Sequence, residues 1–204
     1  VDLYFSENHI DKHANATMVF KTIFMVCLYC LPIIALYVYH LPWYGVLTCF
    51  ALSGFGIAGA GMGVMHDANH GAYSTNKFVN TLLGGTLNIL GGFDVNWRFQ
   101  HNILHHTYTN ITHIDEDIDQ RLKMRWSPYF KYHPVQRFQH IYAFVAYCLA
   151  TWSWTFIKDY KQFYTYTQNG VNKGSKAEIA WDLTKLIFFK VFYYIYILIL
   201  PIYY

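Results

Sequence analysis

The chain has 204 residues, of which 54% are hydrophobic, 20% aromatic and only 13% charged. Charged residues make up about a quarter of an average soluble protein, so this composition excludes intrinsic disorder and disfavours a water-soluble globular domain. The net charge of +3 is small and scattered, which excludes the basic, aromatic-rich surface of a nucleic-acid-binding protein. Eleven histidines nearly match the twelve acidic residues, so membrane insertion and metal binding are the first properties to consider.

Four apolar stretches have the length, roughly 17 to 25 residues, that a helix needs to cross a hydrocarbon core about 30 Å thick. They are residues 22–39, 43–65, 140–157 and 186–204. The first two are separated only by a turn at residues 40–42 and therefore form a helical hairpin. The sequence predicts an all-α fold, a multi-pass membrane helical bundle with about four transmembrane helices, as a single domain over residues 1–204.

A long segment, residues 66–139, separates the second and third predicted spans and holds most of the histidines. It is rich in Lys and Arg, and Lys12 and Lys21 lie on the same side of the membrane in this topology, whereas the hairpin turn has no basic residue. The positive-inside rule therefore places the segment in the cytoplasm. Five lysines in residues 158–185, on the opposite side, weaken this signal.

Two groups of closely spaced histidines lie in this segment. His66 and His70, in MHDANHGAYS, are four residues apart, which on a continuing helix puts both rings on one face about 6 Å apart. His101, His105 and His106, in FQHNILHHTYTN, follow HxxxHH spacing. On an α-helix His101 and His105 share a face and His106 points about 100° away, which favours a second metal ion or a site built from several helices.

Neutral imidazole is a ligand for iron, zinc, copper or nickel, and a structural zinc site would normally include thiolates. The two groups therefore favour a redox metal. Metal-bound histidines usually donate their second ring proton to a neighbouring group, and the candidates here are Asp67, Asn69, Asp94 and Asn96, for which solvation or helix capping is an equal explanation. An acidic patch also follows His113, and it is either a solvated loop, a docking site for an electron donor or support for the metal ligands: Asp115, Glu116, Asp117 and Asp119.

The boxes HDANH (66–70) and HNILHH (101–106), with the preceding GMGVM and the following HHTYTN, resemble the membrane fatty-acid desaturase family. The resemblance extends over almost the whole chain and is nearest to the branch of acyl-lipid, acyl-CoA and front-end desaturases. It implies an O₂-dependent oxidoreductase that introduces a double bond into an acyl chain at a centre of two non-haem iron ions. Carried over residue by residue, the implied iron ligands are His66, His70, His101, His105 and His106.

The resemblance also implies a third histidine box after the last span, and this chain ends before it. We therefore expect a fragment that is itself inactive. The implied substrate is an acyl-CoA or acyl-lipid in the membrane. The His-Pro-Gly-Gly signature of a fused cytochrome b5 domain does not occur, so the implied electron donor is a separate protein such as cytochrome b5 or ferredoxin. The implied location is the bacterial inner membrane, or the endoplasmic reticulum in a eukaryote, with the boxes cytoplasmic.

Two alternatives remain at this stage. A related di-iron membrane hydroxylase or ketolase would have similar box spacing and would insert oxygen instead of removing hydrogens. A membrane electron-transfer protein with haem bound by axial histidines is disfavoured, because its histidines would face each other within the bilayer.

Overall fold

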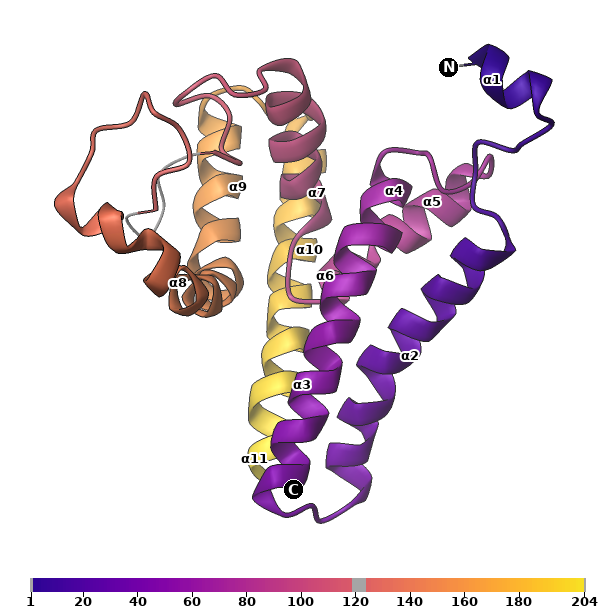
Figure 1. The fold of residues 1–204 in the computed structure, drawn as a ribbon, viewed down its shortest axis with the longest axis vertical. Coiled ribbons are helices and arrows are strands. Elements are labelled where there is room, and N and C mark those ends of the chain that lie inside the picture. The colour runs from indigo at the N-terminus through magenta and orange to yellow at the C-terminus, as the bar shows by residue number, and fades with distance from the viewer. Residues whose placement is uncertain (1, 119–123, 204) are drawn as a thin grey trace. The chain divides into compact units, whose positions relative to one another are not determined.

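The computed structural model describes residues 2–118 and 124–203, and Asp119 of the predicted acidic patch lies outside these residues. Every regular element of the described residues is helical (Figure 1), which confirms the predicted all-α class. The chain forms two compact units. The first unit contains the residues up to Leu90 together with those from Phe189 onward, and the second is Gly91–Phe188.

The first unit is built on a helical hairpin of α2 (Ala16–Val38) and α3 (Trp43–Gly59). The Asn15 side chain caps α2 by accepting a hydrogen bond from the Met18 backbone at 3.0 Å. The two helices pack closely because α3 presents glycine to its partner: a Cβ atom added at Gly56 would lie 2.5 Å from the Tyr29 backbone nitrogen. Ser53 donates a hydrogen bond to the Tyr29 carbonyl at 3.1 Å and fixes the register of the hairpin.

Further elements of the first unit follow the hairpin in sequence. The π-helical segment η1 (Ala60–Met65) continues α3 directly into α4 (His66–Asn69). The short helices α1 (Asp2–Glu7), α5 (Lys77–Gly84) and α6 (Thr86–Ile89) complete the amino-terminal part. At the other end of the chain lie η5 (Ile195–Ile199) and α11 (Leu200–Tyr203), which continue α10 (Lys176–Tyr194).

The second unit begins with α7 (Asp94–Trp97) and the π-helical segment η2 (Arg98–His105). Further along the chain, the 3-10 turn η3 (Pro134–Phe138) leads into α8 (Gln139–Ser153), the π-helical segment η4 (Trp154–Lys158) and α9 (Asp159–Gln168). Its core joins the start of α7 to α9 and α10 through four buried side chains: Phe93, Val95, Phe163 and Leu186.

Three helical runs among the described residues are long and apolar enough to cross a membrane: Ala16–Val38, Trp43–Asn69 and Lys176–Tyr203. They contain the predicted span 43–65, the described part of 186–204 and all of 22–39 except Tyr39, which caps the end of α2, and the chain is a membrane protein. The remaining predicted span, 140–157, is helical as α8 and η4 but is not among these three runs. Its later part is rich in Trp, Thr and Ser, which reduces its hydropathy.

Candidate metal centre

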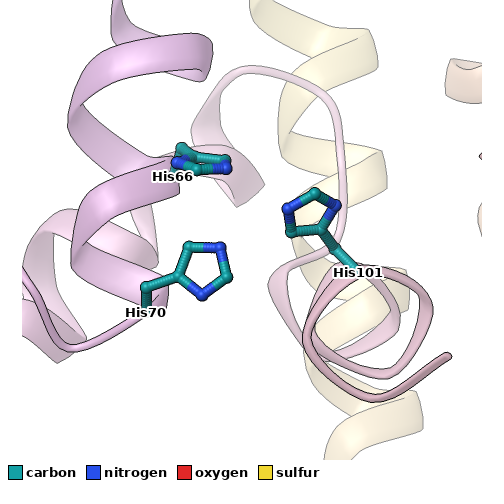
Figure 2. A group of neighbouring side chains, drawn as sticks. All are labelled: His66, His70 and His101. Carbon is teal, nitrogen blue, oxygen red and sulfur yellow. The ribbon is translucent and has the colours of Figure 1, made fainter. Parts of the chain in front are cut away.

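The first histidine box lies where the second membrane-spanning run ends. His66 and His70 flank the single turn of α4, and their ring centroids are 4.6 Å apart with the rings inclined at 68° (Figure 2, which also draws His101 of the second unit). The predicted shared face of this pair is therefore present. Asp67 lies beside His66, with its carboxylate oxygen 3.1 Å from the ring Nδ1, as a partner for a metal-bound histidine must.

The turn that carries the first box is held in place by a buried apolar cluster and by hydrogen bonds that involve α2 and α5. Val64, Ala68 and Tyr73 are buried together, and the Tyr73 hydroxyl hydrogen-bonds to that of Thr22 on α2 at 2.8 Å. Asn69, a predicted histidine partner, donates a hydrogen bond to the Gly84 carbonyl at 3.2 Å and so fastens the box to α5. The helix stops at Gly71, whose φ of +70° is a conformation that favours glycine.

The second histidine box is carried by η2 in the second unit. The rings of His101 and His105 are nearly parallel, 14° apart, with centroids separated by 5.0 Å. The His106 ring is 4.9 Å from His101 and 5.4 Å from His105. The expectation that His106 points away from the other two is therefore wrong. A π-helical turn bonds residue i to i+5, so residues five apart come to the same side of the helix.

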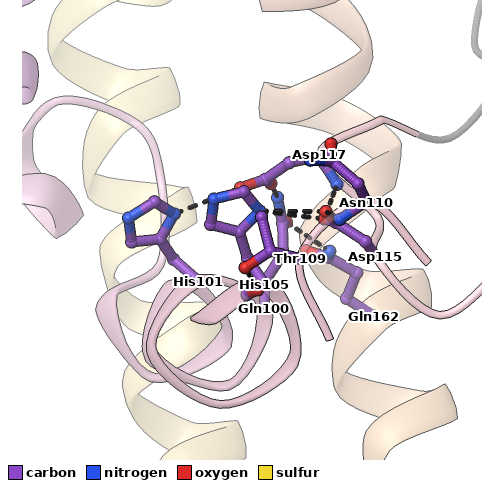
Figure 3. Close-up of polar contacts among 8 residues, drawn as sticks. All are labelled: Gln100, His101, His105, Thr109, Asn110, Asp115, Asp117 and Gln162. Atoms are coloured by element: carbon purple, nitrogen blue, oxygen red, sulfur yellow. Dashed lines mark hydrogen bonds and ion pairs between the residues drawn. The ribbon is translucent and has the colours of Figure 1, made fainter. Parts of the chain in front are cut away.

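A fully buried carboxylate orients His105. The His105 Nδ1 lies 3.1 Å from both carboxylate oxygens of Asp115, whose exposed fraction is 0% (Figure 3). The same carboxylate accepts hydrogen bonds from the backbone nitrogens of Asn110, at 2.8 Å, and Asp117, at 3.0 Å. Burial opposes ionisation, but the bonds from the Asn110 backbone and the His105 ring outweigh it and lower the pKa of Asp115 below its ordinary value.

A second carboxylate, Asp117, contacts the Nδ1 atoms of both stacked rings. Its Oδ2 is 3.1 Å from Nδ1 of His101 and 3.4 Å from Nδ1 of His105. Gln100 donates a hydrogen bond to the other oxygen of this carboxylate (Figure 3). One potential ligand atom from each of His101, His105 and Asp117 lies within 4.8 Å of the others. Because Asp117 contacts the Nδ1 atoms, it is placed to orient both rings and to leave their Nε2 atoms for a metal.

The loop that delivers these carboxylates is bent by two residues with positive φ. Asn110 has φ of 64° and His113 has φ of 71°. Asn tolerates this left-handed conformation better than most residues, and here it turns its own N–H toward Asp115. Non-glycine residues in this region cluster at functional sites, where the surrounding structure holds them.

Helix α9 supports the second box from outside. The Gln162 side chain is buried and donates to Gln100 Oε1 at 2.7 Å and to Glu116 at 2.7 Å. Asn96 donates to the backbone carbonyl of Asp159, the first residue of α9, at 2.7 Å. Asn96 and Asp94 are candidates for accepting a ring proton from a box histidine, with solvation or helix capping as an equal explanation. Asp94 forms an ion pair with Arg98 at 3.1 Å.

The donor set fits a histidine-bound iron. A carboxylate next to Nδ1 fixes the proton on that nitrogen in His101 and His105, and this tautomer carries its lone pair on Nε2. Neutral imidazole is a ligand that iron accepts, and no cysteine lies in either box. The first box has one such histidine–carboxylate pair, formed by His66 and Asp67.

Comparison with known proteins places these boxes in a family. A family model described as fatty acid desaturase matches residues 41–204, most of the chain. The chain belongs to the fatty acid desaturase family. No solved structure matches it.

Three relatives illustrate the likeness to this family. The sn-1 linoleoyl-lipid 6-desaturase of Arthrospira platensis is 30% identical, over 99% of this chain and 54% of the relative. The sn-1 linoleoyl-lipid 6-desaturase of a Synechocystis strain is 35% identical, over 76% and 43% respectively. The acyl-lipid (8-3)-desaturase of Physcomitrium patens is 30% identical, over 98% and 42%. The chain spans about half the length of these curated relatives.

The sequence alone leaves the role of the acidic patch open and does not single out Gln100 and Gln162. In the structure, Asp115 and Asp117 contact the histidines of box two. Glu116 accepts a hydrogen bond from Gln162 on α9. The signal was the run HIDEDID only seven residues after HH. Nothing in that run tells which carboxylate turns inward, because the choice is made by the left-handed residues of the loop.

Proposed function

We propose that this chain carries the first two histidine boxes of an acyl-lipid desaturase, in which His66, His70, His101, His105 and His106 are ligands of two non-haem iron ions. The single observation that carries the proposal is the pairing of His105 with the fully buried Asp115. A carboxylate with no exposed surface that accepts from a ring nitrogen and two backbone nitrogens holds the ring in one orientation, as the partners of metal-binding histidines do.

Each residue of the site then has a defined task. The five imidazoles hold the metal; Asp115 and Asp117 keep the protons of His105 and His101 on Nδ1 and fix the ring planes. Gln100 and Gln162 hold Asp117 and the acidic loop in place. Bound iron supplies, with O₂, an oxidant strong enough to attack an unactivated methylene, which no acidic or basic side chain achieves.

The substrate class follows from the relatives. Those named above are described as acting on linoleoyl-lipid or acyl-lipid, so we propose an acyl chain esterified in a membrane lipid rather than an acyl-CoA. The reaction removes two hydrogens from neighbouring carbons and reduces O₂ to water, so it needs two electrons and two protons from outside the acyl chain. We propose a separate donor such as cytochrome b5 or ferredoxin, and a cytoplasmic location for both boxes.

The test is expression of the complete gene in a host that lacks the activity, with mass spectrometry of its acyl lipids and iron quantification on the purified protein. A new double bond is the expected product. Single changes of each box histidine to Ala should abolish the product and lower the iron content, whereas His13→Ala should leave both unchanged. A hydroxylated product would assign the chain to the related hydroxylases. Retained activity in two or more of the five box variants would refute the ligand assignment.

A further inference from the structure

The chain between the second box and α9, which includes α8 and η4, begins and ends on the same side of the membrane. Helix α9 contacts the box-two region of its own unit through Asn96–Asp159, Gln162–Gln100 and Gln162–Glu116 hydrogen bonds, all at 2.7 Å. In each pair one residue precedes α8 and the other follows η4. The chain before α8 and the chain after η4 therefore lie on the same side of the membrane. A single crossing by α8 and η4 would separate the partners by a hydrocarbon core about 30 Å thick.

The direction of α8 agrees with this. Figure 1 shows α9 running alongside the first half of α10, with which it shares the core contact of Phe163 and Leu186, while α8 is turned out of their common direction. The π-helical segment η4 lies at the bend, and π-helical turns are a recognised cause of helix kinks. Because α10 belongs to a membrane-spanning run, a helix turned across it runs along the membrane plane.

The surface of α8 is apolar on the outside. Ala146 is its only buried residue, whereas Ile141, Phe144 and Val145 are exposed, Phe144 to 77%. Leu149 and Trp152 continue this exposed apolar face. Helix α8 therefore buries a small residue against its own unit and exposes large apolar side chains, which is the pattern expected of a helix that contacts lipid.

The loop before α8 has the composition of a membrane interface. Residues 124–158 contain no Asp or Glu but include Arg125, Lys131 and Arg137. Trp126 and Tyr129 are exposed, Tyr129 to 83%. Aromatic side chains gather at the headgroup level of membranes, and basic side chains are attracted to anionic headgroups. A cavity of about 460 Å³ opens between this loop and α8, with Arg125 and His140 in its lining, in a position to receive a headgroup phosphate.

The charge distribution of the whole chain supports the same placement. If α8 and η4 do not cross the membrane, the lysines of residues 158–176 lie on the side of the histidine boxes. Apart from Lys21, Lys185 and Lys190, which lie inside the membrane-spanning runs, the Lys and Arg residues of the sequence then lie on that side, and the hairpin turn at 40–42 has none. The conflict that these lysines created for the positive-inside rule disappears.

We propose that residues 124–158, comprising the basic loop, η3, α8 and η4, form an interfacial element. It lies in the headgroup region of the leaflet that faces the histidine boxes, binds anionic lipid through Lys131, Arg137 and the Arg125 cavity, and does not cross the bilayer. This placement concerns topology and lipid contact, so it stands or falls independently of the proposed activity.

Side-specific labelling tests the topology. In a complete protein whose native cysteines are replaced by Ser, single cysteines are placed by Lys173→Cys after α9, Ile111→Cys in the box-two loop and His40→Cys in the hairpin turn. A membrane-impermeant maleimide is applied to intact and to permeabilised cells. Lys173→Cys and Ile111→Cys should react under the same condition and His40→Cys under the other. Reaction of Lys173→Cys together with His40→Cys would overturn the proposal.

Depth measurements test the lipid contact. A polarity-sensitive fluorophore on Phe144→Cys is compared in nanodiscs whose acyl chains carry bromine near the headgroup or near the methyl end; Tyr164→Cys on α9 is the matched exposed control. Quenching should be strongest with bromine near the headgroup and weak for the control. Strongest quenching near the methyl end, or none at all, would overturn the interfacial placement.

The same label tests the lipid charge. Replacing zwitterionic by anionic lipid should increase the quenching at Phe144→Cys, and Lys131→Gln combined with Arg137→Gln should abolish that increase. Arg125 is left in place because its guanidinium also donates to the backbone carbonyls of Pro128 and Phe130. An increase that persists in the double variant would refute the role of the basic residues.

Discussion

Replacing Asp115 by Asn tests the central feature of box two, because it keeps the shape of the side chain and removes its charge. The carboxylate uses both oxygens as acceptors, for the backbone nitrogens of Asn110 and Asp117 and for the His105 ring. An amide has one acceptor oxygen, so one of the two backbone donors must face an NH₂ group and lose its partner. The side chain is fully buried, so water does not replace the lost bond.

The size of the effect follows from these contacts. A hydrogen bond to a charged acceptor contributes about 1.5–3 kcal/mol, and an unsatisfied buried donor costs about as much. A loss of about 2 kcal/mol makes local opening of the loop roughly 30-fold more frequent. Hydrogen exchange of a peptide covering residues 107–117, measured by mass spectrometry, should accelerate by that factor, and the iron content should fall with it.

The chain offers a matched control for this experiment. Asp11 accepts hydrogen bonds from the ring Nδ1 of His13, at 2.8 Å, and from its backbone nitrogen, at 2.9 Å, but its side chain is 73% exposed. Asp11→Asn should leave local exchange unchanged, because water takes over these bonds. A change of less than about threefold for Asp115→Asn, against the roughly 30-fold expected from the lost bonds, would refute the reasoning; so would an equal effect of Asp11→Asn.

Three further substitutions test the surrounding structure. Gly56→Ala should lower the thermal stability of the purified protein in detergent, because its Cβ would lie 2.5 Å from the Tyr29 backbone, whereas Gly54→Ala, with no atom within 4 Å, should not. Asn110→Ala should cost about 1–2 kcal/mol in the loop, measured by hydrogen exchange, and Asn110→Gly should be tolerated, because only the former strains the left-handed backbone. Gln162→Leu removes an amide NH₂ that lies within hydrogen-bond distance of Gln100, Glu116 and Tyr166, and it should reduce iron retention during dialysis against a chelator; unchanged retention would exclude α9 from supporting the site.

The sequence predicts the membrane-spanning runs well because their signal is local and strong. The predicted span 43–65 ends too early and the predicted span 186–204 begins too late, since the helical runs are Trp43–Asn69 and Lys176–Tyr203. Hydropathy marks the part of a helix that contacts lipid, and polar residues such as Lys176 extend the same helix beyond it. The stretch 140–157 is less clear from its sequence, because its Trp, Thr and Ser residues lower its hydropathy below that of the other three spans while it keeps many large apolar side chains.

The candidate site was predictable in its residue types but less so in its geometry. The spacing of His66 and His70 predicts their shared face, and the structure has it. The grouping of His106 with His101 depends on a π-helical turn, for which apolar periodicity gives no signal. Likewise, the inward turn of Asp115 depends on backbone angles set by contacts from distant parts of the unit.

The π-helical form of η2 makes the second box unusually sensitive to changes in chain length. A π-helical turn holds one residue more than an α-helical turn, so deleting any single residue between Arg98 and His105 lets the backbone close into an ordinary α-helix. The deletion can spare all three histidines and still separate their rings. Insertions and deletions that a surface loop would absorb are therefore far more harmful in these eight residues than most amino-acid replacements, and attempts to recombine this segment between related enzymes must preserve its length as strictly as its histidines.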